Sequence, residues 1–201
     1  MRVKTEAKRQ SILAIAGPMF LEEGFAEVSM SAVAARIGGS KSTLYNYFSS
    51  KEALFTAFVV EAGRKRFSVL AGVELSPQGA GATLVELGTV FLELLLSPEI
   101  LSINRLVIAE AIRIPQVGRI FFENGPQKVS AEFERVFGLL AERGLIPAHL
   151  VPLAARQFKS LCETDTYERC LWGIEQAVSR PTIRGTAEQA AAAIGQLYAL
   201  E

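Results

Sequence analysis

The chain has 201 residues, half of them hydrophobic, which suffices for one small and one larger domain with buried cores. Its net charge of zero is unevenly distributed: residues 1–51 hold seven Lys and Arg against four Glu, a net +3, and residues 52–201 hold 14 against 17 acidic residues, a net −3. A basic segment of this kind is typical of a surface that meets a polyanion such as a nucleic acid. The chain has a single His and a single Asp, and no catalytic triad, paired-carboxylate site or phosphate-binding Gly loop is expected. Residues 1–10 are polar, which argues against a signal peptide, and the apolar stretches are interrupted by Glu, which argues against a membrane span.

The first predicted helix ends at Gly24. Its inner face repeats Ile12, Ala16, Met19 and Phe20 at helical spacing. Gly24 can adopt the left-handed conformation that ends a helix without steric cost. This helix is therefore expected to present one apolar stripe to the core.

The second predicted helix covers residues 30–37 and lasts about two turns. Ser29 is its expected N-cap, because the hydroxyl can accept from amides of the first turn. Its single apolar stripe consists of Val33, Ala34 and Ile37. Gly38 can end the helix in the left-handed conformation, and Gly39 extends the turn. A third helix follows at once, which predicts a helix-turn-helix.

The third predicted helix covers residues 41–48, with Ser40 as its N-cap and Leu44 and Phe48 on its buried side. Its outer face is unusual for a solvated surface: it holds one charge, no carboxylate and several hydroxyls and amides that can bond phosphates or base edges. The residues of this face are Lys41, Ser42, Thr43, Tyr45, Asn46 and Tyr47. We therefore expect the segment to bind DNA.

Within this segment different side chains are expected to do different tasks. Ser42, Thr43 and Asn46 are predicted to contact bases, because Asn pairs with adenine and the Thr methyl contacts thymine. Phosphates are predicted to be bound by Tyr45, Tyr47 and Lys51, the last at the start of a helix capped by Ser50. The other expected DNA contacts are Ser29, Ser31, Ser40 and Lys41. Two competing interpretations remain. Tyr45 or Tyr47 is buried against the first helix, or Asn46 is only a solvated residue on the surface of the third helix.

The remaining three quarters of the chain are also predicted to be helical, without any alternating strand pattern. The expected helices are residues 52–70, 82–97, 98–114, a short helix from Pro115, 127–143, 151–176 and, after a stop at Pro181, 186–200. Cys162 and Cys170 would lie on one helix with roughly 12 Å of rise between them, too far apart to pair while that helix persists. Free thiols favour a cytoplasmic protein.

Residues 9–55 closely resemble the DNA-binding domain of TetR-family transcriptional repressors. The resemblance rests on SKSTLYNYF at residues 40–48 followed by SKEALF at residues 50–55. Two departures stand out. The family usually has Ala-Gly-Val where this chain has Ile37-Gly38-Gly39, an exchange that keeps the apolar volume and that core packing tolerates. Ser42 stands where Gly is common and adds a hydroxyl that can donate to a phosphate.

A second resemblance covers the C-terminal part. Residues 105–126, RLVIAEAIRIPQVGRIFFENGP, and residues 158–173 are similar to the AefR-like class of TetR-family ligand-binding domains. Together the two resemblances imply an all-α protein with an N-terminal three-helix DNA-binding domain, residues 1–51, and a larger helical ligand-binding and dimerisation domain, residues 52–201.

In this family two helices and their symmetry mates form a four-helix bundle between subunits. Two apolar stripes are the candidates for that interface. Their residues are Val129, Phe133, Val136, Phe137, Leu140, Ala155, Phe158, Leu161 and Cys162. The competing interpretation is that one or both stripes face the core of the single chain.

An apolar effector pocket is expected in the larger domain. Its candidate lining residues are Phe91, Leu95, Leu106, Phe121, Phe122, Tyr167 and Trp172, with Arg105, Glu110 and Arg113 as polar candidates. Ordinary core packing explains the apolar members equally well. Glu110 and Arg113 stand at i, i+3 and can pair with each other on the helix surface.

The sequence thus predicts a TetR-type repressor that binds a palindromic operator as a homodimer and is released by a small, largely apolar effector. Its expected partners are double-stranded DNA, a second copy of the chain and that effector, without a cofactor, a metal or a membrane. The alternatives are a helical interaction module that does not bind DNA and a helical enzyme. Both predict that replacing Tyr45 or Lys51 leaves function intact.

Overall fold

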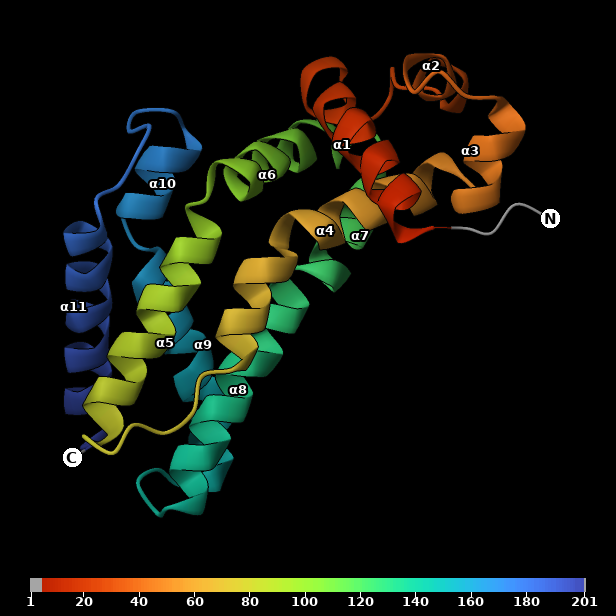
Figure 1. The fold of residues 1–201 in the computed structure, drawn as a ribbon. Helices are drawn as coiled ribbons and strands as arrows, with labels where there is room; N and C mark the ends of the chain where they lie inside the picture. The colour runs from red at the N-terminus through yellow and green to blue at the C-terminus, as the bar shows by residue number, and fades with distance from the viewer. Residues whose placement is uncertain (1–4, 201) are drawn as a thin grey trace. The chain divides into compact units, whose positions relative to one another are not determined.

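The structure, a computed structural model, describes residues 5–200, which form helices and connecting turns without any strand in that range (Figure 1). The all-α prediction is confirmed. The helices are α1 (Glu6–Glu23), α2 (Met30–Arg36), α3 (Lys41–Tyr47), α4 (Lys51–Ala71), α5 (Ala80–Leu95), α6 (Pro98–Glu110), α7 (Pro115–Asn124), α8 (Pro126–Glu142), the 3-10 turn η1 (Ala148–Leu150), α9 (Val151–Glu163), α10 (Thr166–Leu171) and α11 (Arg180–Tyr198).

The chain divides into two compact units. The first runs to Ala62 and includes Ser102–Gly125, and the second consists of Gly63–Leu101 and the chain from Pro126 on. The helices α4 and α6 therefore contribute residues to both units. The packing division runs through these two helices, and the predicted functional boundary after residue 51 stays a prediction.

The first unit is built around four phenylalanines, Phe20, Phe25, Phe55 and Phe58. The ring of Phe55 meets those of Phe20 and Phe25 edge to face, with centroids 5.2 and 5.1 Å apart, which is a favoured aromatic geometry. Gly17 lets Phe58 approach α1, since a Cβ there would lie 2.5 Å from the ring. This core fixes α1 against α4 and supports the helices between them.

The second unit packs α5, α8, α9 and α11 around a separate core, with α11 lying along α5 (Figure 1). Phe133 on α8 contacts Phe91 on α5 and Phe158 on α9, with ring centroids 5.1 and 5.8 Å apart. Gly88 sits where α5, α9 and α11 converge: a Cβ built on it would lie 3.0 Å from the Ala187 Cβ. A side chain at position 88 would therefore push these helices apart.

The continuous helix predicted over residues 151–176 is wrong, because α9 ends at Glu163. At Asp165 the backbone takes φ 57° and ψ −69°, and the Thr166 N–H donates to the Thr164 carbonyl at 2.7 Å, which makes a γ-turn with positive φ. Cys162 and Cys170 consequently lie on different helices. Neither cysteine forms a disulfide, and both are buried.

The predicted stop at Pro181 is also wrong, because α11 begins at Arg180. Ser179 caps the helix by accepting from the Thr182 N–H at 3.2 Å. Proline fits the first turn because its missing N–H would have no helical partner there. The pattern therefore marked a helix start, six residues before the predicted one.

Eight of the nine residues predicted for the dimer interface belong to the core of the single chain. Val129, Phe133, Val136, Phe137, Leu140, Ala155, Phe158 and Cys162 are each at most 6% exposed. A side chain that is already buried within one chain has no surface left for a second copy. The assignment of these eight residues is therefore corrected, and only Leu161, 38% exposed, keeps a free surface.

Candidate DNA-binding surface

The turn between α2 and α3 has the geometry that two adjacent glycines favour. Gly38 has φ 64°, its N–H donates to the Ala35 carbonyl at 3.1 Å, and the Gly39 N–H donates to the Ala34 carbonyl at 3.1 Å. These two bonds form a Schellman motif, which ends α2 and turns the chain into α3. A Cβ on Gly39 would lie 3.5 Å from the Ile37 side chain. Positions 37 and 39 are thus neighbours, as the proposed exchange of apolar volume requires.

The three predicted serine caps are confirmed. The hydroxyls of Ser29, Ser40 and Ser50 each accept from the backbone N–H three residues on, at 3.1, 3.0 and 3.1 Å. Each cap satisfies one of the N–H groups that the start of a helix leaves without a partner. The starts of α2, α3 and α4 are therefore defined by local hydrogen bonds.

The outer face of α3 is exposed as the pattern predicted. Leu44 is fully buried, while Lys41, Ser42 and Asn46 are exposed and Tyr45 is 50% exposed. The interpretation that Tyr45 is buried against the first helix is contradicted by this exposure. Thr43 is half-buried, and its hydroxyl oxygen lies 2.9 Å from that of Ser40. Ser31, on the first turn of α2, is also exposed.

Tyr47 lies at the edge of this face and reaches the start of α1. It is half-buried against the first core, and its hydroxyl accepts from the Thr5 N–H at 3.2 Å. Tyr47 thus combines features of a phosphate-binding residue and of a residue buried against the first helix: its ring is partly covered, and its hydroxyl lies near the surface.

Lys51 is bonded within the chain. Its ammonium donates to the carbonyls of Phe25 and Ala26 at 2.8 and 3.1 Å and lies 4.5 Å from the centroid of the Phe25 ring. The neighbouring Glu52 faces the N-terminus of α4: its own backbone N–H, then the Ser50 hydroxyl and the Lys51 charge, lower the pKa of its carboxyl. A carboxylate at this helix start competes with a phosphate for the same N–H groups.

Glu110, at the last residue of α6, reaches the same loop from the other side. Its carboxylate accepts from the Ala26 N–H at 3.1 Å. Gly24, with φ 88°, makes room for it, because a Cβ there would lie 2.6 Å from Glu110 Oε1. The expected surface pair with Arg113 is thus replaced by a contact across 84 residues. No local sequence signal indicates a contact over that separation.

The predicted effector-binding residues are divided between the two units. Phe91 and Leu95 pack in the second core, whereas Leu106 and Phe121 pack in the first. Tyr167 is half-buried, and burial together with the nearby Glu163 charge raises the pKa of its hydroxyl. The other three are exposed, Arg105 together with Phe122 at 58% and Trp172 at 71%.

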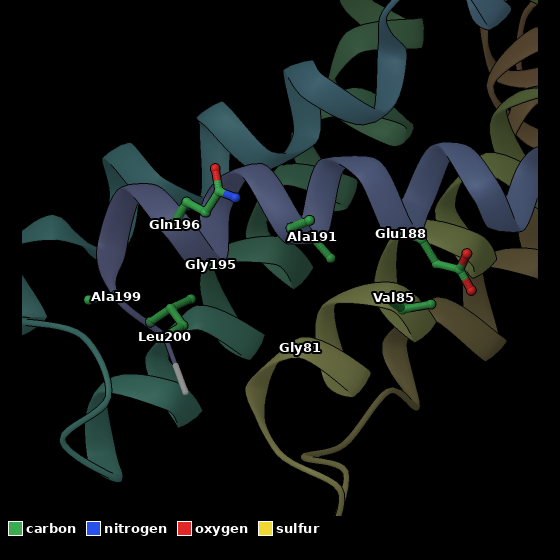
Figure 2. A pocket seen from close by; sticks show the side chains of 9 residues that line it. Gly81, Val85, Glu188, Ala191, Gly195, Gln196, Ala199 and Leu200 are labelled. Carbon is green, nitrogen blue, oxygen red and sulfur yellow. The ribbon is translucent and has the colours of Figure 1, made fainter.

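Two grooves of the second unit are lined by other residues. One, of about 690 Å³, lies between α5 and α11. Figure 2 shows that small residues such as Gly81, Ala191 and Gly195 make up much of its lining. Its residues are Gly81, Val85, Glu188, Ala191, Ala192, Gly195, Gln196, Ala199 and Leu200. The other, of about 260 Å³, is lined by both charged and apolar residues, including Arg66, Glu93 and Arg180. The effector-binding residues therefore stay a prediction.

Within residues 5–200, no group of three or more His, Cys, Asp and Glu side chains is arranged to hold a metal ion. No helix in this part of the chain is both long and apolar enough to cross a membrane.

A capped helix-turn-helix with an exposed, carboxylate-free second helix, joined to a larger helical unit, defines a DNA-binding regulator. The sequence matches the bacterial regulatory proteins of the TetR family over residues 12–58 and the C-terminal domain of AefR-like transcriptional repressors over residues 82–200. The chain belongs to the TetR family of transcriptional regulators, which are not enzymes.

Relatives of known sequence and structure agree with this assignment. The chain is 39% identical over 62 residues to the regulator Rv1255c of Mycobacterium tuberculosis and 38% identical over 61 residues to UidR of Escherichia coli, in each case over 31% of the relative's length. Two solved structures are similar over nearly the whole chain, each with 25% identity: a TetR-family regulator from Mesorhizobium loti, with TM-score 0.81 and 98% of both chains covered, and the flavonoid-responsive regulator FrrA, with TM-score 0.83 and 96% and 97% covered.

Proposed function

We propose that this protein is a cytoplasmic homodimeric repressor that binds a palindromic operator and is released by a small, largely apolar effector. The observation that carries the proposal is the exposed outer face of α3, where Lys41, Ser42, Tyr45 and Asn46 stand without a carboxylate. Such a face offers hydrogen-bond donors and a positive charge to phosphate oxygens and base edges, and it has no carboxylate to repel them. The experiment is an electrophoretic mobility shift on the promoter next to the protein's own coding sequence.

Bases and phosphates are proposed to be bound by different residues of this face. Asn46, Ser42 and Thr43 contact base edges, while Lys41 and Tyr45 contact the phosphates of the DNA backbone. Asn46→Ala should cost about 1–3 kcal/mol of binding free energy and relax specificity at one base pair per half-site. Selection from randomised sites measures this, and an unchanged preference would refute the role of Asn46.

The dimer is proposed to form through the outer surfaces of α9 and α11. Leu153 and Leu161 on α9 and Leu197 on α11 are 43%, 38% and 62% exposed. The two helices are linked at this surface, because Gln157, one turn from each α9 leucine, accepts a 2.6 Å bond from the hydroxyl of Tyr198, the neighbour of Leu197. Three exposed leucines around such a link suit burial against a second copy.

Leu197→Glu should produce a folded monomer, because it places a charge in the proposed interface. The matched control is Ile112→Glu, since Ile112 is 91% exposed on the other unit and should leave the dimer intact. Sedimentation gives the oligomeric state and circular dichroism the fold. A Leu197→Glu protein that still sediments as a dimer would show that the interface lies elsewhere.

Operator binding should reflect the two-fold symmetry of such a dimer. The recognition helices α3 are expected about 35 Å apart, one helical turn of DNA. If each subunit neutralises three or four phosphates, log K against log salt should have a slope of about −5 to −7. A monomeric variant should lose about half of that slope.

The effector is proposed to bind the larger helical domain and to bind the free protein more tightly than the DNA-bound one. Only such a difference in affinity between two states can release the operator. FrrA is described as flavonoid-responsive. A panel of flat aromatic and aliphatic compounds, tested for release of bound DNA, is therefore the first screen.

A further inference from the structure

The loop between α1 and α2 is held on both sides by charged side chains from distant parts of the chain. Lys51 of α4 donates to the Phe25 and Ala26 carbonyls, and Glu110 of α6 accepts from the Ala26 N–H. We infer that Lys51 and Glu110 are positioning residues for DNA binding, which hold Ala26 and with it the start of α2 without touching DNA. The inference rests on the DNA binding proposed above.

The charges suit the backbone groups that they meet. The Lys51 ammonium lies against the carbonyl of Ala26, and the Glu110 carboxylate lies against its N–H, at 3.1 Å in each case. Hydrogen bonds with a charged partner are roughly twice as strong as neutral ones. Ala26 is exposed and has no apolar anchor of its own, so these two bonds define its position.

Displacement of Ala26 would be passed to the DNA-binding helices over a short distance. Ser29, the N-cap of α2, follows three residues later, and the loop begins at Gly24, whose φ of 88° belongs to a flexible residue. Phe25 and Val28 are 3% and 1% exposed and fix the two ends of a short exposed segment, Ala26 and Glu27. Loss of either charged contact therefore frees mainly this segment, which leads through Val28 into α2.

A direct phosphate contact is the competing role for Lys51. Two of its three N–H donors already serve the carbonyls, and the Phe25 ring lies under the ammonium. The Glu52 carboxylate on the next residue also repels an approaching phosphate. These contacts favour a lysine that acts through the loop.

The test compares salt dependence. Operator DNA selected by the wild-type protein is titrated by fluorescence anisotropy at several salt concentrations with wild type, Lys51→Ala, Glu110→Ala and Lys41→Ala. Glu110→Ala should weaken binding about tenfold, as loss of one charge-assisted hydrogen bond does, and Lys51→Ala, which loses two such bonds, should weaken it at least as much, in both cases with the salt slope unchanged. The matched control Lys41→Ala should reduce the slope by about 1.8, because a dimer loses two phosphate contacts.

A reduced slope for Lys51→Ala, or wild-type affinity for both loop variants, would overturn the inference. Circular dichroism melts check the fold, and a loss of affinity that the unfolded fraction accounts for would overturn it as well. Failure of the wild type to bind any DNA would instead refute the proposed function.

The double variant gives an independent readout. Since both side chains hold the same residue, losing the second should matter less once the first is gone, so Lys51→Ala/Glu110→Ala should lose much less than the product of the single losses. Lys51→Arg should keep most of the affinity, because its guanidinium can also donate to both carbonyls. Multiplicative losses, or an arginine variant as weak as the alanine one, would contradict a shared role at Ala26.

Discussion

Gly88 should be the least replaceable helical glycine of the second unit. A Cβ at this position would lie 3.0 Å from Ala187 Cβ, 3.2 Å from Cys162 Sγ and 3.2 Å from the Phe158 ring. All three neighbours are buried, so none can swing into solvent. Gly88→Ala gains about 1 kcal/mol of helix propensity but should lose about 1–3 kcal/mol by overpacking.

Gly138 provides the matched control. It lies inside α8, and a Cβ built on it meets no atom within 4 Å. Gly138→Ala should therefore keep the whole propensity gain of about 1 kcal/mol. Urea denaturation followed by circular dichroism at equal protein concentration should place the two variants about 1–3 kcal/mol apart. If Gly88→Ala were as stable as Gly138→Ala, the packing at the α5–α9–α11 junction would be refuted.

Three further predictions concern thiols and backbone conformation. Cys162 and Cys170 should not react with a thiol reagent at pH 8 until the protein unfolds, and rapid labelling of the native protein would contradict their burial. Burial raises the pKa of Cys162 from 9.0 to about 12, so the unfolded chain loses this proton first and the free energy of unfolding should fall as the pH rises from about 9. Ala199→Gly should raise stability by about 1 kcal/mol, since Ala199 ends α11 at φ 51°, and an unchanged melting temperature would argue against that C-cap. Asp165→Gly should also stabilise by about 1 kcal/mol by relieving the positive φ of the γ-turn, and a lower melting temperature would mean that the carboxylate has a role.

Local signals in the sequence were sufficient for the helix-turn-helix. Ser29 and Ser40 precede apolar residues at helical spacing, and Gly38 follows the last of them, so caps, turn and buried side all follow from chemistry within a few residues. The break after α9 had no such signal, because it depends on the backbone of Asp165, a residue that also fits inside a helix. Pro181 was ambiguous, since proline both ends helices and begins them.

Contacts between distant segments could not be derived from periodicity. The stripes around Phe133 and Phe158 correctly indicated which side of α8 and α9 is apolar, but an apolar stripe does not specify whether its partner is the same chain or another copy. Of the three exposed leucines of the proposed interface, only Leu161 was among the predicted interface residues, because Leu153 and Leu197 lie outside the two apolar stripes. Glu110 resembled an ordinary surface carboxylate, and only the folded chain places it beside Ala26.

The burial of both native cysteines makes the protein suited to single-site labelling. Because neither thiol is accessible in the folded chain, a cysteine introduced at an exposed position would be the one site that takes up a maleimide dye. Glu22→Cys, on the exposed side of α1 and outside the proposed DNA contacts, is such a position. Energy transfer between the two dyes of a dimer would then follow the separation of its two α1 helices, and so of the units that carry α3, in solution, and would show directly whether an effector changes it.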